Sequence, residues 1–211
     1  MTEDHETREA DSAYHRRLPI GEVLDGGVLT EGDRASFDQV SMAALAPMLV
    51  PEPPRAGTVD LAACAHCRPS EHTIWHDDVW QVRAGWDRMG IPFVGGLAPR
   101  DHVLLETAPP EVLAALGPLM QRISAAVKAI PGVARCHFAR WGDGSEHFHL
   151  WALARPEGMM QGRGAVLALW DDVLPAMPDH MVRDHLAVVA EALASGGGRA
   201  FPEAGPGATD T

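Results

Sequence analysis

The sequence predicts an α+β domain on a mostly antiparallel sheet, with one long helix packed on it and extra helices towards the C-terminus. The order of the segments carries this prediction: strand-like segments come first, followed by one long helical segment, two more strand-like segments and then helices, as is typical of α+β domains. In addition, the last two strand-like segments are joined by a short, glycine-containing connection at residues 141–145. So short a connection favours an antiparallel pair.

The chain divides by composition into three parts. Its 211 residues are enough for one domain with a sizeable core. Residues 1–59 predict a partly disordered N-terminal extension, with short helical pieces within 34–49 and a proline-rich stretch at 47–54. Residues 60–194 predict the folded domain, and residues 195–211, rich in Gly, Pro and Ala, predict a disordered tail.

The first half of the domain contains several strand-like segments. Residues 73–76 and 79–82 flank an acidic turn, and together they predict a short β-hairpin. Residues 92–96, which contain proline and glycine, predict a loop with a strand fragment. Residues 102–106 predict a further strand.

The clearest helix in the sequence covers residues 109–130. Its apolar residues recur at helical spacing and predict one buried stripe. They are Val112, Leu116, Leu119, Met120, Ile123, Val127 and Ile130. Pro118 lies within this segment and predicts a kink or a break, and Pro131 followed by Gly132 predicts the end of the helix.

The next segments predict two paired strands, at residues 135–140 and from about residue 146 to 155. Alternate residues of a strand share a face. One face of the second strand carries His147, His149, Trp151 and Leu153, and the other carries Phe148, Leu150 and Ala152. The second face is core. The first face carries two histidines that packing alone does not require.

The C-terminal part of the domain predicts helices. Residues 165–177 are mostly apolar. A final helix starts with Asp179 as its N-cap and ends at Gly196. Its apolar positions, which predict one buried face, are Val182, Leu186, Val189 and Leu193.

Charge and composition exclude several classes of function. The net charge is −12, Lys128 is the single lysine and the arginines are scattered, which argues against a nucleic-acid partner. The sequence has no apolar run of about 18 residues and no signal-peptide pattern. We therefore expect a cytoplasmic protein without a membrane partner. Three cysteines do not make a disulfide framework in such a compartment.

Two of these cysteines, Cys64 and Cys67, form a CxxC motif that predicts a metal site. Zinc commonly takes four Cys and His ligands, and a CxxC supplies two of them from one turn. His102 and His147 are candidates for the other two. The spacing alone also allows His66, His72 or His76 in place of His102. A redox-active CxxC should open a helix, whereas a proline follows closely here.

His149 is the candidate catalytic residue, because a neutral imidazole is a competent nucleophile towards phosphorus and a general base. The glycine-containing turn before it could contact phosphate oxygens. Candidate substrate contacts are the backbone of Gly144, the hydroxyl of Ser145, the charge of Arg140 or Arg155, and the indole of Trp151. Trp151 is equally compatible with a core position, and Ser145 with a role in the turn.

At these motifs the sequence resembles the histidine triad (HIT) superfamily, including its galactose-1-phosphate uridylyltransferase branch. The resemblance covers residues 63–156 and rests on the order of the motifs: a CxxC, a hairpin, a segment at 98–103, a long helix opened by proline, and a glycine turn before an HxH strand. It implies a HIT-like α+β fold. It also implies a structural Zn²⁺ held by Cys64, Cys67, His102 and His147.

The resemblance implies an enzyme that acts on a small-molecule nucleotide conjugate, such as a dinucleoside polyphosphate. In the family, the histidine that matches His149 attacks the α-phosphorus and forms a nucleotidyl-histidine intermediate, which water or an acceptor then resolves. Family members are commonly homodimers. Two departures favour an alternative, a catalytically inactive zinc-stabilised module that binds nucleotides or partners: Trp151 replaces the third histidine of the strand, and the glycine turn is shorter than usual.

Overall fold

The structure is a computed structural model of the whole chain, and it describes residues 8–9, 20–21, 37, 39, 43–85 and 88–201. The chain forms two compact units, Met1–Pro54 and Arg55–Thr211. In the first unit, strand β1 (Arg8–Glu9) pairs antiparallel with strand β2 (Leu49–Val50). The predicted helical pieces at residues 34–49 lie mostly outside the described residues, and residues 43–48 contain no helix.

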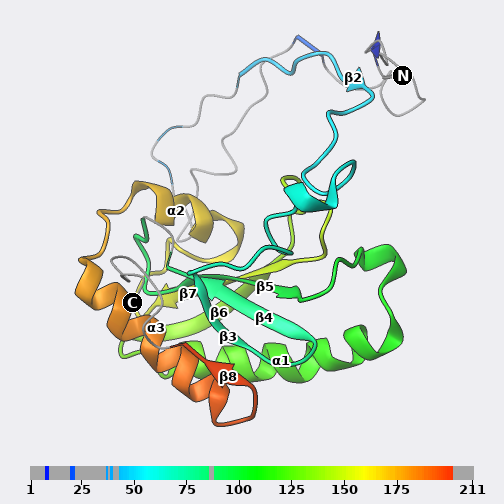
Figure 1. Ribbon diagram of the computed structural model, residues 1–211. Coiled ribbons are helices and arrows are strands. Elements are labelled where there is room, and N and C mark those ends of the chain that lie inside the picture. The colour runs from blue at the N-terminus through cyan, green and yellow to red at the C-terminus, as the bar shows by residue number, and fades with distance from the viewer. Residues whose placement is uncertain are drawn as a thin grey trace. The chain divides into compact units, whose positions relative to one another are not determined.

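The second unit is built on a six-stranded sheet in the order β6-β7-β5-β4-β3-β8, and every neighbouring pair is antiparallel (Figure 1). The strands are β3 (Thr73–His76), β4 (Trp80–Ala84), β5 (Val94–Pro99), β6 (Val133–Ala139), β7 (Leu150–Pro156) and β8 (Arg199–Ala200). The predicted α+β class with a mostly antiparallel sheet is confirmed. The predicted hairpin is β3 and β4.

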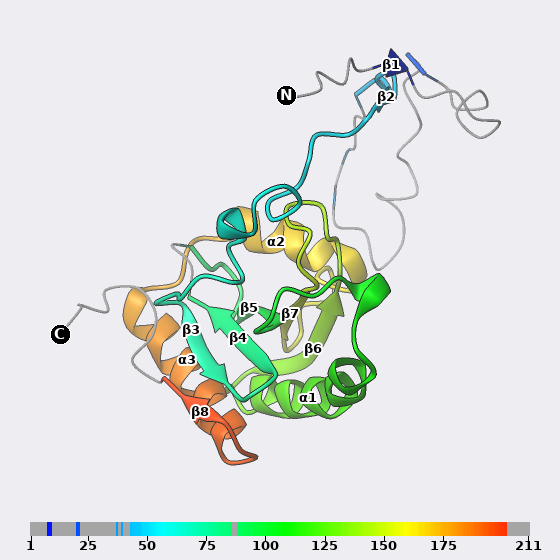
Figure 2. The same cartoon turned by 45° about the vertical axis from the view of Figure 1, so that its right-hand side comes forward.

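Two long helices bury one face of the sheet (Figure 2). They are α1 (Pro110–Lys128) and α3 (Asp179–Ala194). The apolar positions predicted for each helix are buried in, or packed against, one core cluster with the strands. The other face has a smaller cluster, in which Leu153 of β7 packs with Leu167 of α2 (Leu167–Val173) and with Ile91. No helix in the described parts of the chain is long and apolar enough to cross a membrane.

Helix α1 continues through Pro118, so the predicted break does not occur. Pro110 occupies the first turn, where a missing backbone N–H costs nothing. The N-cap of helix α3 is Pro178, not Asp179 as predicted. Asp179 is the first residue of the helix, where its carboxylate interacts favourably with the positive end of the helix dipole.

Strand β5 corrects the prediction for this part of the chain, because it covers Val94–Pro99 and residues 102–104 form no strand. Its two glycines make the sequence look like a loop. A Cβ at Gly95 would lie 2.5 Å from the ring of Phe93, so only glycine leaves room for that buried ring. After Pro99 the chain leaves the sheet and forms a short 3₁₀ helix, η4 (Leu105–Thr107).

Strand β7 begins at Leu150, later than the predicted start near residue 146. The residues just before β7 do not pair with strand β5. They lie against the segment that follows Pro99, where the Phe148 N–H donates to the carbonyl of Val103 at 2.7 Å. The predicted alternation of faces nevertheless holds. Phe148 and Ala152 lie in the main core, while Trp151 packs against the smaller cluster on the other face.

The first residues of the predicted disordered tail belong to the sheet, which corrects the prediction at residues 195–200. Strand β8 pairs with β3 after a glycine turn, and the indole N–H of Trp75 donates to the carbonyl of Gly197 at 3.0 Å. Gly198 has φ +85°, and a Cβ there would lie 2.6 Å from the Trp75 ring. The glycines that suggested disorder are therefore required for a tight turn over a buried indole.

Candidate metal centre and nucleophile site

The CxxC motif sits on a turn that is held in place from strand β4. It follows the 3₁₀ helix η3 (Leu61–Ala63). Arg83, which is buried, donates to the carbonyl oxygens of Ala65 at 2.6 Å, His66 at 3.0 Å and Arg68 at 2.6 Å. Gln81 also donates to the carbonyl of His66, at 2.8 Å. One guanidinium group and one amide group thus fix the backbone on both sides of the second cysteine.

The structure brings the four predicted metal ligands together. The ligand atoms of Cys64, Cys67, His102 and His147 all lie within 4.8 Å of one another. The Sγ of Cys64 lies 3.4 Å from Nδ1 of His147, and the Sγ of Cys67 lies 3.4 Å from Nδ1 of His102. Ligand atoms bound to one tetrahedral zinc at about 2.0–2.3 Å are about 3.3–3.8 Å apart. The four side chains therefore fit a zinc ion.

The hydrogen bonding of His147 also suits a metal ligand. Its Nε2 lies 2.9 Å from the carbonyl oxygen of Pro99. A carbonyl oxygen can only accept, so Nε2 carries the proton and the lone pair of Nδ1 faces the two sulfurs. Burial lowers the pKa of His147 to about 4, against the hydrogen bond to Pro99. The ring is neutral at pH 7, as a zinc ligand must be.

The residues around Cys67 and His102 also bear on metal binding. Burial, together with the neighbouring Cys64, raises the pKa of Cys67 to about 11, so binding zinc as a thiolate releases protons. A Cβ at Gly57 would lie 2.9 Å from Cε1 of His102, and this glycine has φ +88°. Gly57 belongs to the residues before 60 that the sequence assigned to the N-terminal extension, yet it is part of the second compact unit.

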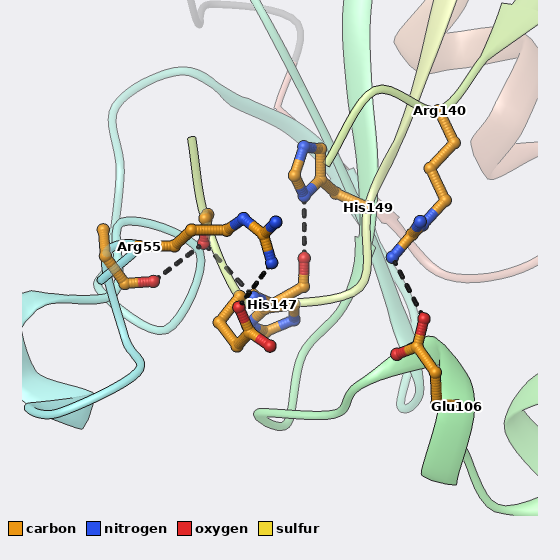
Figure 3. Close-up of polar contacts among 8 residues, drawn as sticks. Arg55, Glu106, Arg140, His147 and His149 are labelled. Atoms are coloured by element: carbon orange, nitrogen blue, oxygen red, sulfur yellow. Dashed lines mark hydrogen bonds and ion pairs between the residues drawn. The ribbon is translucent and has the colours of Figure 1, made fainter. Parts of the chain in front are cut away.

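His149 lies beside this centre but outside it. Its Nδ1 lies 2.7 Å from the carbonyl oxygen of His147, as the dashed line in Figure 3 shows. Nδ1 therefore donates, and the lone pair of Nε2 is available for chemistry. The ring stacks on His66, with centroids 4.7 Å apart and planes 23° apart. Trp151 meets the same ring edge-on at 6.4 Å.

The residues predicted to contact the substrate make contacts within the protein. Arg140 pairs with exposed Glu106 at 3.7 Å (Figure 3). The Ser145 hydroxyl donates to the carbonyl of Ala56 at 3.4 Å and accepts from the His147 N–H at 3.3 Å. The carbonyl of Gly144 accepts from the Ala56 N–H at 3.4 Å. Ser145 and Gly144 thus help to hold the turn, and their contact with a substrate stays a prediction.

The sequence did not predict the roles of two residues of the site. His66 appeared there only as a substitute metal ligand, but its ring covers His149 and also lies 5.1 Å from the His147 ring. Burial lowers the pKa of His66 to about 3, and the neighbouring His149 and His147 act in the same direction.

The second residue whose role the sequence did not predict is Arg83. A charged residue within strand β4 is the one sequence signal that could have pointed to it.

We expect Arg83→Met to weaken zinc binding without unfolding the domain. The variant loses the hydrogen bonds that order the turn between Cys64 and Cys67, and losing such support around metal ligands typically costs about 10–100-fold in affinity. Competition with a chromogenic chelator measures this change. Arg135→Met, at an exposed position of β6, is the matched control and should leave zinc affinity unchanged. Equal affinity in both variants would contradict the role of Arg83.

No protein-family model matches the sequence, and no curated protein matches it. Solved structures do resemble it. One is a zinc-bound histidine triad family protein from Mycobacterium smegmatis, with 20% identity and a TM-score of 0.46 over 64% of this chain and 95% of that one. Another is a Hit-like protein involved in cell-cycle regulation from Bartonella henselae, with 18% identity and a TM-score of 0.42 over 59% and 88%.

A uridylyltransferase is also similar, with 18% identity and a TM-score of 0.45 over 63% of this chain and 45% of that chain. This protein thus spans less than half of the uridylyltransferase. The likeness to all three structures concerns the fold. Histidine triad proteins and a uridylyltransferase are among the solved structures that this chain resembles, as the order of its motifs predicts.

Proposed function

We propose that this protein is a nucleotide hydrolase or nucleotidyltransferase in which His149 attacks the α-phosphorus of a nucleotide conjugate. The observation that carries the proposal is the hydrogen bond from Nδ1 of His149 to the carbonyl oxygen of His147. It fixes the tautomer in which Nε2 has a lone pair and directs the ring. The resemblance of the motifs to the histidine triad superfamily supports the same assignment.

The proposed reaction has two displacements. Nε2 of His149 forms a bond to the α-phosphorus, and the bond from phosphorus to the leaving group breaks, with the leaving group taking the electron pair and then a proton from water. Water or an acceptor hydroxyl next attacks the phosphorus, loses its proton to solvent, and the N–P bond breaks. His149 returns to its neutral form. Whether water or an acceptor resolves the intermediate separates hydrolase from transferase.

Zinc bound by Cys64, Cys67, His102 and His147 would have a structural role. It would hold the His147 ring, whose backbone carbonyl in turn holds His149. The protein carries a net charge of −12, so an anionic substrate needs local positive charge. Arg140 is our candidate, with a substrate phosphate replacing the carboxylate of Glu106 as its partner.

The test of this function is nucleotide release by the zinc-loaded protein from dinucleoside polyphosphates, nucleoside phosphoramidates and nucleotide sugars at neutral pH. We expect release from at least one class, and an acid-labile phosphorus–nitrogen adduct on His149 when the reaction is quenched. A folded, zinc-loaded protein that releases nothing and forms no adduct would favour the catalytically inactive binding module instead.

We expect His66 to act through the position of His149. His66→Ala removes the stacked ring and should lower kcat by about 10–100-fold, because a misplaced nucleophile costs about that much. His66→Phe restores a flat ring and should recover most of kcat, with KM little changed in both variants. Steady-state kinetics at matched zinc content measures this. Loss of kcat in both variants would show that the imidazole itself, not its stacked face, is required.

A further inference from the structure

Residues 55–57 pack against the metal centre, although the sequence assigns them to the extension before the domain. Gly57 is buried, whereas both of its neighbours in the chain are exposed. A Cβ at Gly57 would lie 2.9 Å from Cε1 of His102 and 3.2 Å from Cβ of Cys64, which are two of the four clustered ligands. We call residues 55–57 the strap. Its fit against these two side chains leaves no room for a side chain of its own.

The strap also pairs with the turn that precedes His147. The Ala56 N–H donates to the carbonyl of Gly144 at 3.4 Å, and the Glu146 N–H donates to the carbonyl of Ala56 at 3.0 Å. These bonds form a parallel bridge between Ala56 and Ser145, whose hydroxyl donates to the same Ala56 carbonyl at 3.4 Å. One residue of the strap is thus bonded to three successive residues of the turn.

An ion pair holds the first residue of the strap to the same turn. Nη1 of Arg55 lies 3.1 Å from Oε2 of Glu146 (Figure 3). The two side chains are 38% and 30% exposed, so water screens the pair and its contribution is small. The strap belongs to none of the six strands of the sheet. It can therefore open while the sheet stays folded.

The close fit at Gly57 makes the position of the strap depend on the two ligands that it contacts. Zinc bound by Cys64 and His102 would hold each side chain in one orientation. Without the metal, these side chains regain rotational freedom. A rotation of the His102 ring moves its atoms into the space that the strap occupies. The closed strap is therefore favoured when the metal centre is loaded.

We propose that the strap couples metal binding to the position of the turn at residues 144–146, with Gly57 as the positioning residue. A loaded metal centre holds the strap closed, and the closed strap orders the turn through the backbone of Ala56. This coupling is separate from the one through the ring of His147. Its effect on the reaction rests on the proposed function, because it takes the turn to contact a phosphate of the substrate.

The experiment measures how fast trypsin cuts the bond between Arg55 and Ala56 in the full-length protein, with the fragments identified by mass spectrometry. Trypsin must take the Arg55 side chain from Glu146 and Ala56 from the turn, so it cuts only the open strap. The bond after Arg163, an exposed residue, is the internal reference. Removing zinc with a zinc-selective chelator should raise the ratio of the two rates at least about tenfold.

Two variants open the strap of the zinc-loaded protein, and zinc is quantified in each sample. Gly57→Ala places a side chain at φ +88° and against His102, and it should raise the ratio of rates about tenfold. Gly158→Ala is its matched control, because Gly158 has φ +75° and an added Cβ there would meet nothing within 4 Å. Glu146→Gln removes the ion pair and should raise the ratio about two- to fivefold. Glu157→Gln, at an exposed position, should leave it unchanged.

The effect of the strap on the reaction is measured by steady-state kinetics with the best substrate. Gly57→Ala should raise KM about tenfold with kcat little changed, because the turn shifts while the hydrogen bond from His149 to the His147 carbonyl remains. Gly158→Ala should keep both constants. A variant that lost activity through general instability would instead have a lower kcat, since a smaller fraction of the protein would be active.

A bond after Arg55 that is cut equally fast with and without zinc would overturn the coupling. So would equal acceleration at both bonds, or a zinc-loaded Gly57→Ala variant with the wild-type ratio. If Gly57→Ala fails to load zinc, Glu146→Gln decides the question in its place. Proteolysis needs no substrate, so zinc-dependent protection in a protein without turnover would sustain the strap and count against the enzyme. Turnover that depends on His149, without an effect of zinc on the bond after Arg55, would do the reverse.

Discussion

His149→Ala should abolish nucleotide release and adduct formation while leaving zinc content and the unfolding temperature close to those of the wild type. The variant removes the Nε2 lone pair that the hydrogen bond to the His147 carbonyl directs. Loss of a nucleophile commonly lowers kcat by about a thousandfold or more. Because His149 is not among the four clustered ligands, zinc binding should persist. Single-turnover assays with zinc quantified in the same sample measure both effects.

His180→Ala is the control for this variant, since His180 is an exposed histidine at the start of helix α3. It should retain full turnover. If His149→Ala retained full turnover as well, the mechanism would be wrong whatever the substrate, and catalysis would have to come from another residue. If both variants were equally slow, the loss would reflect damage to the preparation or to the fold.

Cys64→Ala should have the largest effect on stability, because it removes a fully buried ligand from the metal centre. An ion that binds only the folded state at about 1,000 times its Kd stabilises that state by about 4 kcal/mol. Losing this contribution should lower the unfolding temperature by about 10 °C in a domain of this size. Differential scanning calorimetry with zinc quantification measures the change, and His147→Ala should behave in the same way.

Cys136→Ala is the matched control for Cys64→Ala, since Cys136 is a free cysteine of β6 outside the cluster. Its unfolding temperature should change by only a few degrees. A strong chelator should destabilise the wild type and Cys136→Ala to about the level of Cys64→Ala, and it should have little further effect on Cys64→Ala. A chelator effect of full size in Cys64→Ala would mean that this cysteine is not a ligand.

Much of the fold could be predicted because local patterns and tertiary packing agree. The apolar stripe of α1 and that of α3 both face the core, and the alternation along residues 148–153 separates Phe148 and Ala152 from Trp151 and Leu153. The errors at β5 and at β8 share a cause, which is glycine. In β5 and before β8 the glycines read as loop or disorder, yet Gly95 and Gly198 are needed where a backbone passes close to the rings of Phe93 and Trp75.

The candidate site could also be predicted only in part. The metal cluster could be predicted because Cys64 and Cys67 form a local motif and because the motif order assigns His102, rather than the other nearby histidines, to the set. A charged residue within a strand marks Arg83 as unusual, but its partners could not be predicted, because they are backbone carbonyl oxygens that any residue provides. The stacking of the His66 ring on the His149 ring could not be predicted, because it brings together two segments that are distant in the sequence.

The metal centre also constrains the order in which the chain can fold. Its contacts join residues separated by 35 positions, from Cys67 to His102, and by 83 positions, from Cys64 to His147. Contacts so distant in sequence form late and slowly, since the intervening chain must first be ordered. During synthesis the CxxC turn therefore leaves the ribosome long before its last partner. Until the segment that carries His147 follows, its thiols are available to competing metals and oxidants.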